Sequence, residues 1–131
     1  MDIRTKDGKY VIDVSYENWF SLYSTIVGRI EEKDEVCEAI NFLKEMKCHW
    51  SQGKTIARQV NLIRDKLSQV KPEDAIYSID DLKKKAPWVG KLSPVITSCA
   101  NMYTTNDGKD LLYEIVSILC YSEYTKNDVI V

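Results

Sequence analysis

Histidine and glycine are scarce in this chain of 131 residues, and both shortages exclude classes of site. A single histidine, His49, cannot form a His-pair metal site or a His-x-x-x-His helix. Cys48 precedes it directly, and adjacent side chains of an extended chain point to opposite sides, which argues against a Cys-His dyad. The five scattered glycines form neither a P-loop nor a Gly-x-Gly-x-x-Gly turn. We therefore expect no catalytic residue, no metal and no cofactor.

Long apolar runs and a basic charge balance are also missing. No run approaches the roughly 18 residues of a membrane span, and residues 1–7 lack the apolar stretch of a secretory signal. The net charge is −2, whereas nucleic-acid binders usually carry a basic stripe. The longest basic run, residues 83–85, follows two aspartates and is typical of a solvated turn. These absences predict a cytoplasmic protein with no membrane and no nucleic-acid partner.

The cysteines supply no disulfide framework. Cys37, Cys48, Cys99 and Cys120 are far apart in the sequence and include no Cys-x-x-Cys pair. Cys37 and Cys120 lie within apolar helical patterns, where we expect them to pack as small hydrophobic residues. A chain of this size without an export signal is expected to keep its thiols reduced.

The composition is sufficient for one packed domain. Hydrophobic residues make up 44% of the chain and charged residues 29%, which suits a core beneath a solvated surface. A chain of this length can bury roughly two thirds of its unfolded surface, so it needs no disulfide or metal for stability. Because there is no internal repeat or linker, residues 1–131 are expected to form a single domain, either a monomer or a weak homodimer.

Hydrophobic spacing predicts the elements of the first half. Alternation over residues 9–14 predicts a strand, and Ser15 is placed to cap the helix that follows. The apolar residues of that helix are Trp19, Phe20, Tyr23, Ile26, Val27 and Ile30. A second helix is predicted over residues 34–47, with Val36, Cys37, Ile40, Leu43 and Met46 inward. The loop of residues 49–53 separates it from a third helix, which carries Ile56, Val60, Ile63, Leu67 and Val70 and ends before Pro72.

The second half of the chain is less regular. Short strands are predicted at residues 75–79 and 102–105, with Asp80 and Asp81 capping a brief helical turn between residues 80 and 85. Thr105 or Asn106 is expected to cap a C-terminal helix, and residues 128–131 to form a final strand. The buried stripe of that helix is Leu111, Leu112, Ile115, Val116 and Leu119. The class is therefore α+β, a small sheet of three to four short strands packed against about four helices.

Two features are candidates for binding a partner. The first is an acidic run with a net charge of −4 over residues 31–38, since five carboxylates oppose Lys33; its acids are Glu31, Glu32, Asp34, Glu35 and Glu38. This run is either a solvated turn between helices or an electrostatic docking patch for a basic partner. The second is Trp88, which lies between Pro87 and Pro94. It is either a core plug beneath its loop or an exposed anchor, because Trp is enriched in interface hot spots.

The acidic residues around Gly108 allow a different hypothesis. Asp107 and Asp110 superficially resemble part of a calcium loop, but the spacing to a bidentate glutamate fails. Negative charge in the first turns of a helix suits the helix dipole, so capping accounts for both residues. The alternatives are a small enzyme that uses this carboxylate pair, or a regulatory or scaffold subunit of a cytoplasmic complex. The absence of other catalytic patterns favours a protein that works by binding another protein.

Several short motifs occur in order along the chain. They are Ile79-Asp80-Asp81-Leu82, Ala86-Pro87-Trp88, Ser93-Pro94-Val95-Ile96-Thr97, Asn101, and Thr105-Asn106-Asp107-Gly108-Lys109-Asp110-Leu111. Their spacing resembles the C-terminal half of the immunity protein 70 family. The helix with Phe20, Ser24-Thr25-Ile26 and Ile30-Glu31 is similar to the N-terminal helix of that family, and Asp128-Val129-Ile130 resembles its last strand. Val89 stands where the family pattern has glycine, and Met102 where an aromatic residue is usual.

This resemblance implies a bacterial immunity protein of a polymorphic toxin system. Such a protein resides in the cytoplasm, binds one cognate toxin domain and neutralises it by stoichiometric occlusion, without catalysis. Because Val89 departs from the family pattern, it argues against carrying over a binding role of the Trp88 loop from the family.

Overall fold

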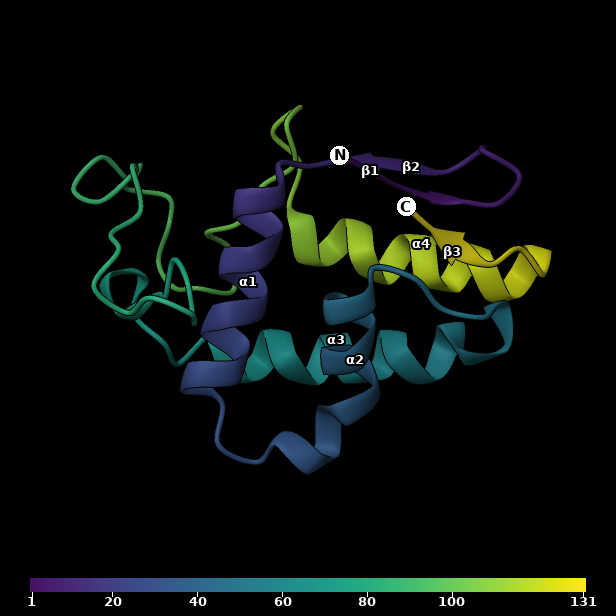
Figure 1. Ribbon diagram of the computed structural model, residues 1–131, viewed down its shortest axis with the longest axis horizontal. Helices are drawn as coiled ribbons and strands as arrows, with labels where there is room; N and C mark the ends of the chain where they lie inside the picture. Colours follow the sequence, from purple (N-terminus) through teal and green to yellow (C-terminus); the bar gives the residue numbers. More distant parts are fainter.

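Four α-helices and one small antiparallel sheet make up the computed structural model, which describes all 131 residues (Figure 1). The helices are α1 (Tyr16–Arg29), α2 (Cys37–Glu45), α3 (Gly53–Leu67) and α4 (Leu111–Thr125). The strands are β1 (Asp2–Thr5), β2 (Val11–Asp13) and β3 (Val129–Ile130). Short 3₁₀ turns occupy Lys33–Val36, Trp50–Gln52 and Pro72–Asp74. This arrangement confirms the predicted α+β class. No helix has both the length and the apolar character that a membrane crossing requires.

The sheet has the strand order β2-β1-β3, so its central strand is the first in the chain. Ile3 pairs with Ile12 across β1 and β2, and Thr5 pairs with Val129 across β1 and β3. The strands predicted near residues 9–14 and 128–131 are confirmed as β2 and β3. We did not predict β1, because Ile3 is its one apolar residue and gives no visible alternation.

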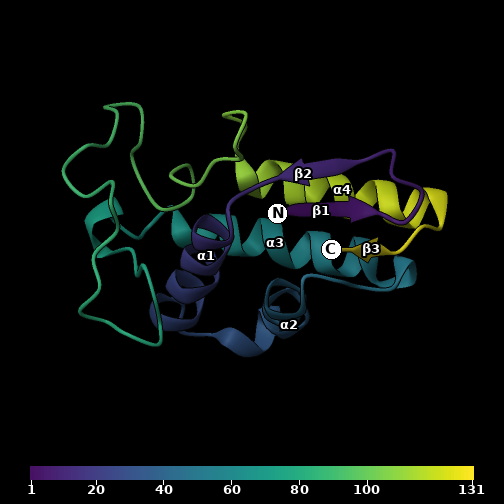
Figure 2. The same cartoon turned by 45° about the horizontal axis from the view of Figure 1, so that its top comes forward.

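Helix α4 lies between the sheet and α3, and α3 and α4 run side by side in both ribbon views (Figures 1 and 2). The predicted apolar stripe of α4 is buried, apart from the half-buried Val116. The two helices approach closely at Gly53, where an added Cβ would overlap the backbone oxygen of Leu119. A residue without a side chain is therefore required at the start of α3.

Helix α1 begins where the sequence predicted. The Ser15 hydroxyl accepts a hydrogen bond from the backbone N–H of Asn18 at 3.1 Å, which confirms Ser15 as the N-cap. On the inner face of α1, the Trp19 indole donates to the backbone oxygen of Leu43 at 2.7 Å and packs edge-on against Phe42. The largest aromatic side chain of the core therefore ties α1 to α2.

Residues 75–79 do not form the predicted strand. Instead, the Ile76 N–H donates to the Thr25 hydroxyl at 2.9 Å, and the Ile76 carbonyl accepts from the Ser21 hydroxyl at 2.9 Å. The Ile79 N–H donates to the Ser24 hydroxyl at 3.0 Å. Side chains of α1 thus satisfy the backbone groups that a neighbouring strand would have paired.

Other predicted boundaries were wrong in the second half of the chain. Asp81 caps a single turn by accepting from the Lys83 N–H, and no helical turn reaches Lys85. Residues 102–105 contribute one isolated bridge, between Thr104 and Asp110, and not a strand. The N-cap of α4 is Asp110 and neither Thr105 nor Asn106, since the Asp110 carboxylate accepts the N–H of Tyr113.

The second helix is shorter than predicted. A 3₁₀ turn, Lys33–Val36, precedes α2, and a left-handed Met46 (φ 60°) ends it. All four cysteines are free. The prediction that Cys37 and Cys120 pack as core residues was wrong, because both lie on the solvent side of their helices. In α2, Ala39 and Phe42 take the inward positions next to Leu43.

Candidate partner-binding surfaces

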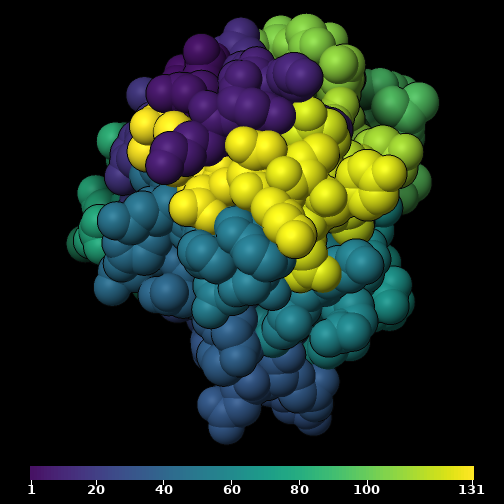
Figure 3. Space-filling view, turned by 90° about the vertical axis from the view of Figure 1, so that its right-hand side faces the viewer, coloured from purple at the N-terminus to yellow at the C-terminus, as the bar shows by residue number.

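The acidic run of residues 31–38, here called the acidic turn, projects from one end of the molecule. It follows α1 and lies at the bottom of the space-filling view (Figure 3). All five of its carboxylate side chains are exposed, whereas Val36 is fully buried and anchors the turn to the core. The sequence therefore presents its densest negative charge on a protrusion with a single apolar anchor.

Part of this charge is already engaged within the chain. Lys66 of α3 lies 3.8 Å from Glu32 and 3.9 Å from Glu35. Exposed pairs of this kind contribute little to stability because solvent screens them. Glu31 and Asp34 have no salt-bridge partner. Adding Lys66 to the charge of −4 leaves −3 on this surface, so the acidic turn stays strongly negative.

Glu38 is the most constrained of the five acids. The Gln59 side-chain amide donates to its carboxylate at 2.5 Å, and the Cys37 thiol donates at 3.2 Å. These bonds, that from Gln59 first, lower the pKa of Glu38 below its ordinary value. The Glu38 carboxylate is therefore held in place and stays ionised at neutral pH.

Trp88 is half-buried and lines a pocket of about 660 Å³, here called the Trp88 pocket. Its ring meets that of Tyr77 edge-on, with centroids 5.6 Å apart. The ring thus packs partly against the segment that contains Tyr77 and partly faces a cavity. Whether it anchors a partner stays a prediction.

Two consecutive turns shape the Trp88 loop. The Val89 N–H donates to the Ala86 carbonyl, which places Pro87 at the second position of a turn, where its fixed φ is favoured. The Lys91 N–H donates to the Trp88 carbonyl, and Gly90 has a φ of +77° in this second turn. Glycine is therefore required at position 90, which explains why a valine at position 89 is tolerated.

The acidic turn begins close to one residue of the Trp88 pocket, at the C-terminal end of α1. Arg29 lines the pocket and lies two residues before the first acid of the turn. Its Nε donates to the Asp74 carbonyl at 2.9 Å, which joins α1 to the segment that forms the pocket wall. The structure thus links the two sequence-predicted binding features through the last turn of α1, although the acidic turn and the loop of residues 82–92 extend in different directions (Figure 1).

Asp107 and Asp110 each serve the local backbone. Asp110 caps α4 and lies 3.4 Å from Arg64. Asp107 accepts from the Thr105 hydroxyl at 2.5 Å in a turn that Gly108 closes with a φ of +83°. The bond from Thr105 lowers the pKa of Asp107, whereas two carboxylates that share a proton would raise one pKa. This geometry gives no support to the carboxylate enzyme. No group of three or more His, Cys, Asp or Glu side chains is arranged to hold a metal.

His49 has neighbours that the sequence analysis missed. Its Nδ1 lies 2.7 Å from the Ser51 hydroxyl, and its Nε2 lies 4.0 Å from a carboxylate oxygen of Asp128. These residue types occur in hydrolase triads, but the same Nδ1 accepts the Ser51 backbone N–H and caps the Trp50–Gln52 turn. The Asp128 oxygen accepts the Trp50 N–H at 2.9 Å. The cluster therefore fixes a loop, and the distant position of Asp128 in the sequence concealed it.

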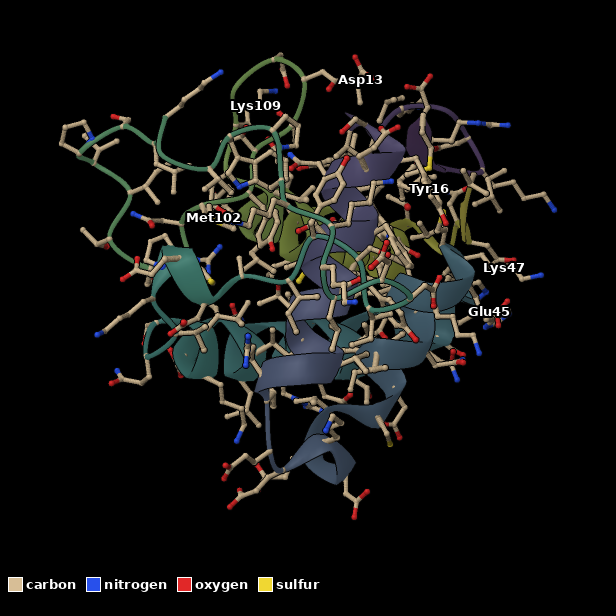
Figure 4. The ribbon with its side chains drawn as sticks, turned by 60° about the vertical axis from the view of Figure 1, so that its left-hand side comes forward. Asp13, Tyr16, Glu45, Lys47, Met102 and Lys109 are labelled. Carbon is tan, nitrogen blue, oxygen red and sulfur yellow. The ribbon has the colours of Figure 1, made fainter.

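The sequence also did not predict an aromatic groove at the surface of α1. Tyr16, Phe20 and Tyr23 stack in series, with centroids 5.8 Å and 6.1 Å apart, beside a hollow of about 370 Å³. Tyr16 is exposed and lies on the same flank as Glu45 and Lys47 (Figure 4). The helical spacing predicted Phe20 and Tyr23, but not Tyr16, as part of one apolar face, and spacing alone does not reveal which part of a face lies at the surface.

A protein-family model described as immunity protein 70 matches residues 7–131 of the chain. The chain belongs to the immunity protein 70 family. The match includes the acidic turn, the Trp88 pocket and β3, and it begins in the hairpin after β1. Membership implies an immunity protein with a protein partner and a non-enzymatic role. No curated protein and no solved structure matches the chain.

Proposed function

We propose that this immunity protein 70 family member is a bacterial antidote that binds one cognate polymorphic toxin domain in the cytoplasm. The observation that carries the proposal is the family match over residues 7–131. Neutralisation follows from stoichiometric occlusion of the toxin's active site or of a neighbouring surface. The local structural roles of Asp107, Asp110 and His49 support a binding function over catalysis.

The acidic turn is the docking element in this proposal. Its carboxylates are exposed on a protrusion, and Glu31 and Asp34 form no salt bridge that would have to break before a partner binds. Complementary charge accelerates encounter and fixes the orientation of two proteins. The toxin surface that meets this turn is therefore basic.

Co-expression tests the proposal directly. Cells that express the toxin domain encoded immediately upstream should survive when this protein is made with it, and purified components should form a one-to-one complex. Size-exclusion chromatography with light scattering gives the stoichiometry, and also shows whether the free antidote is a monomer or a homodimer. Loss of viability despite abundant soluble antidote would remove the proposed function.

Charge reversal tests the role of the acidic turn. The variant Glu31→Lys/Asp34→Lys changes the two acids that have no salt-bridge partner, so the fold should be retained. Asp2→Lys/Asp65→Lys is a matched control, since both aspartates are exposed and lie outside the turn. Stopped-flow association at low salt should be about tenfold slower for the first variant, because steering contributes 10-fold or more to such rates. Equal association rates for the two variants would place the interface elsewhere.

A further inference from the structure

The Trp88 pocket has one fixed wall and one wall that is held by local turns. Ser21 and Arg29 of α1 form the fixed wall together with Ala75 and Tyr77, in the segment bonded to α1 by hydroxyl groups. The other wall comes from residues 82–92, whose backbone hydrogen bonds are within the segment itself or to residue 81. The cavity of about 660 Å³ lies within the roughly 300–1,000 Å³ range of ligand pockets. It therefore has room for more than one side chain of a partner.

The charges around this pocket are positive and unpaired. Arg29, Lys84 and Lys85 oppose one acid, Glu73, so the lining carries a net charge of +2. None of the three cations forms a salt bridge, and Lys84 lies over the Tyr77 ring at 5.6 Å. Cations without partners around an aromatic cavity suit an anionic occupant that also carries an apolar group.

The rim of the pocket is apolar and exposed. Leu82 and Val89 line the cavity and are 71% and 58% exposed. Large exposed aliphatic side chains that surround a cavity are typical of a surface that another protein covers. Trp88 and Tyr77 at its centre are the residue types enriched in interface hot spots. The combination favours a polypeptide occupant.

We infer that the Trp88 pocket binds an acidic segment of the toxin, which inserts an aromatic or large aliphatic side chain between Trp88 and α1 while its carboxylates meet Arg29, Lys84 and Lys85. The inference rests on the proposed function and adds the chemistry of the partner. Arg29 of the positive pocket lies two residues before the first acid of the acidic turn, so the toxin presents an acidic segment close to a basic patch. Two surfaces of opposite sign fix the orientation of the complex, because a rotated partner would bring like charges together.

Charge reversal in the pocket provides the first test, with the purified toxin domain encoded upstream as the probe. Lys84→Glu/Lys85→Glu should weaken the complex at least about tenfold in calorimetry, as expected for interfacial charge pairs that become repulsive. Lys6→Glu/Lys9→Glu is the matched control, because it makes the same change of charge at exposed lysines of the β1–β2 hairpin. The control should bind within about twofold of the wild type. Equal affinity of the pocket variant and the control would overturn the inference.

Photo-cross-linking identifies the occupant. Benzoylphenylalanine in place of Val89 lies on the pocket rim. The control carries it in place of the exposed Val11 in β2. Mass spectrometry of the Val89 product should give a toxin peptide with more Asp and Glu than Lys and Arg, and with an aromatic or large aliphatic residue. A net basic peptide, or no product where the wild type binds, would contradict the inference. Failure of the wild type itself to bind the toxin domain would instead reject the proposed function.

Discussion

The substitution Gly53→Ala tests the closest approach between α3 and α4. Alanine in a helix is normally favoured over glycine by about 1 kcal/mol, so helix propensity alone predicts a more stable protein. The structure predicts the opposite. A Cβ at position 53 would come closer than 3.0 Å to the backbone oxygen of Leu119, and would lie 3.1 Å from Cβ and 3.3 Å from N of Glu123.

The size of the expected stability loss in Gly53→Ala depends on how far α3 and α4 must separate. Ordinary contact begins at 3.4 Å, so α3 and α4 must separate by at least 0.4 Å, and the obstructing atoms include backbone that cannot rotate away. Overpacking of this kind costs typically 1–3 kcal/mol. Subtraction of the gain in propensity leaves about 0–2 kcal/mol, and because the overlapped atom is a backbone oxygen we expect a loss in the upper half of that range, about 1–2 kcal/mol. At roughly 4 °C per kcal/mol, the melting temperature should fall by about 4–8 °C.

Gly28→Ala is the matched control for this experiment. A Cβ at Gly28 would also overlap a neighbour, but that neighbour is Cδ1 of Ile76, the far end of a side chain that can change rotamer. Its stability should change by less than about 1 kcal/mol. Calorimetric melting and urea unfolding of both variants measure the difference. A Gly53→Ala protein at least as stable as the wild type would refute the close approach of α3 and α4.

Further predictions concern buried and exposed polar groups. Tyr103→Phe should destabilise the protein by about 1–3 kcal/mol, because it removes the hydrogen bonds that the buried Tyr103 hydroxyl makes with Ser21 and Thr25; an unchanged urea midpoint would contradict this. Burial raises the pKa of Tyr103 from 10.0 to about 12, so the folded state retains a proton that the unfolded state loses. The stabilisation is complete below pH 10 and is lost as the pH rises toward 12, and unfolding of the wild type should depend more steeply on pH there than that of Tyr103→Phe. Finally, Cys37 and Cys120 should react with a thiol reagent in the native protein before Cys99, whose pKa burial raises to about 12. Fast modification of Cys99 at neutral pH would show that its site opens.

The sequence predicted those elements whose signal is local. Three- and four-residue spacing identified the helices around Trp19, Ile63 and Ile115, and the cap at Ser15 was correct because capping depends on neighbouring backbone alone. The start of α4 was misplaced because the sequence offers several capping residues in a row. Thr105 and Asp107 bond to each other, and only Asp110 is left to cap the helix.

The segment of residues 75–103 was not predictable because its partners are distant in the sequence. An apolar stretch such as residues 75–79 is compatible with a strand, but the hydroxyls of Ser21, Ser24 and Thr25 decide its backbone conformation. The Trp88 pocket was not predictable for the same reason, because Arg29 and Lys84 come together only when residues 75–79 bind to α1. The acidic turn was identified correctly as a charged connection because its composition is local, although its role in binding stays a prediction.

The hydroxyl groups of α1 have a consequence for how this protein can diversify. They hold Ile76 and Ile79 by backbone groups, which every amino acid except proline provides, and Tyr103 closes the same cluster. Residues 80–97 lie between these anchor points and include no fully buried residue, although Trp88, Leu92 and Ile96 pack against the core. New side chains can therefore arise at the exposed positions of this segment other than Gly90 without loss of folding. Under the proposed function, relatives of this protein follow changing partners by altering this loop while the helices and sheet beneath it stay the same.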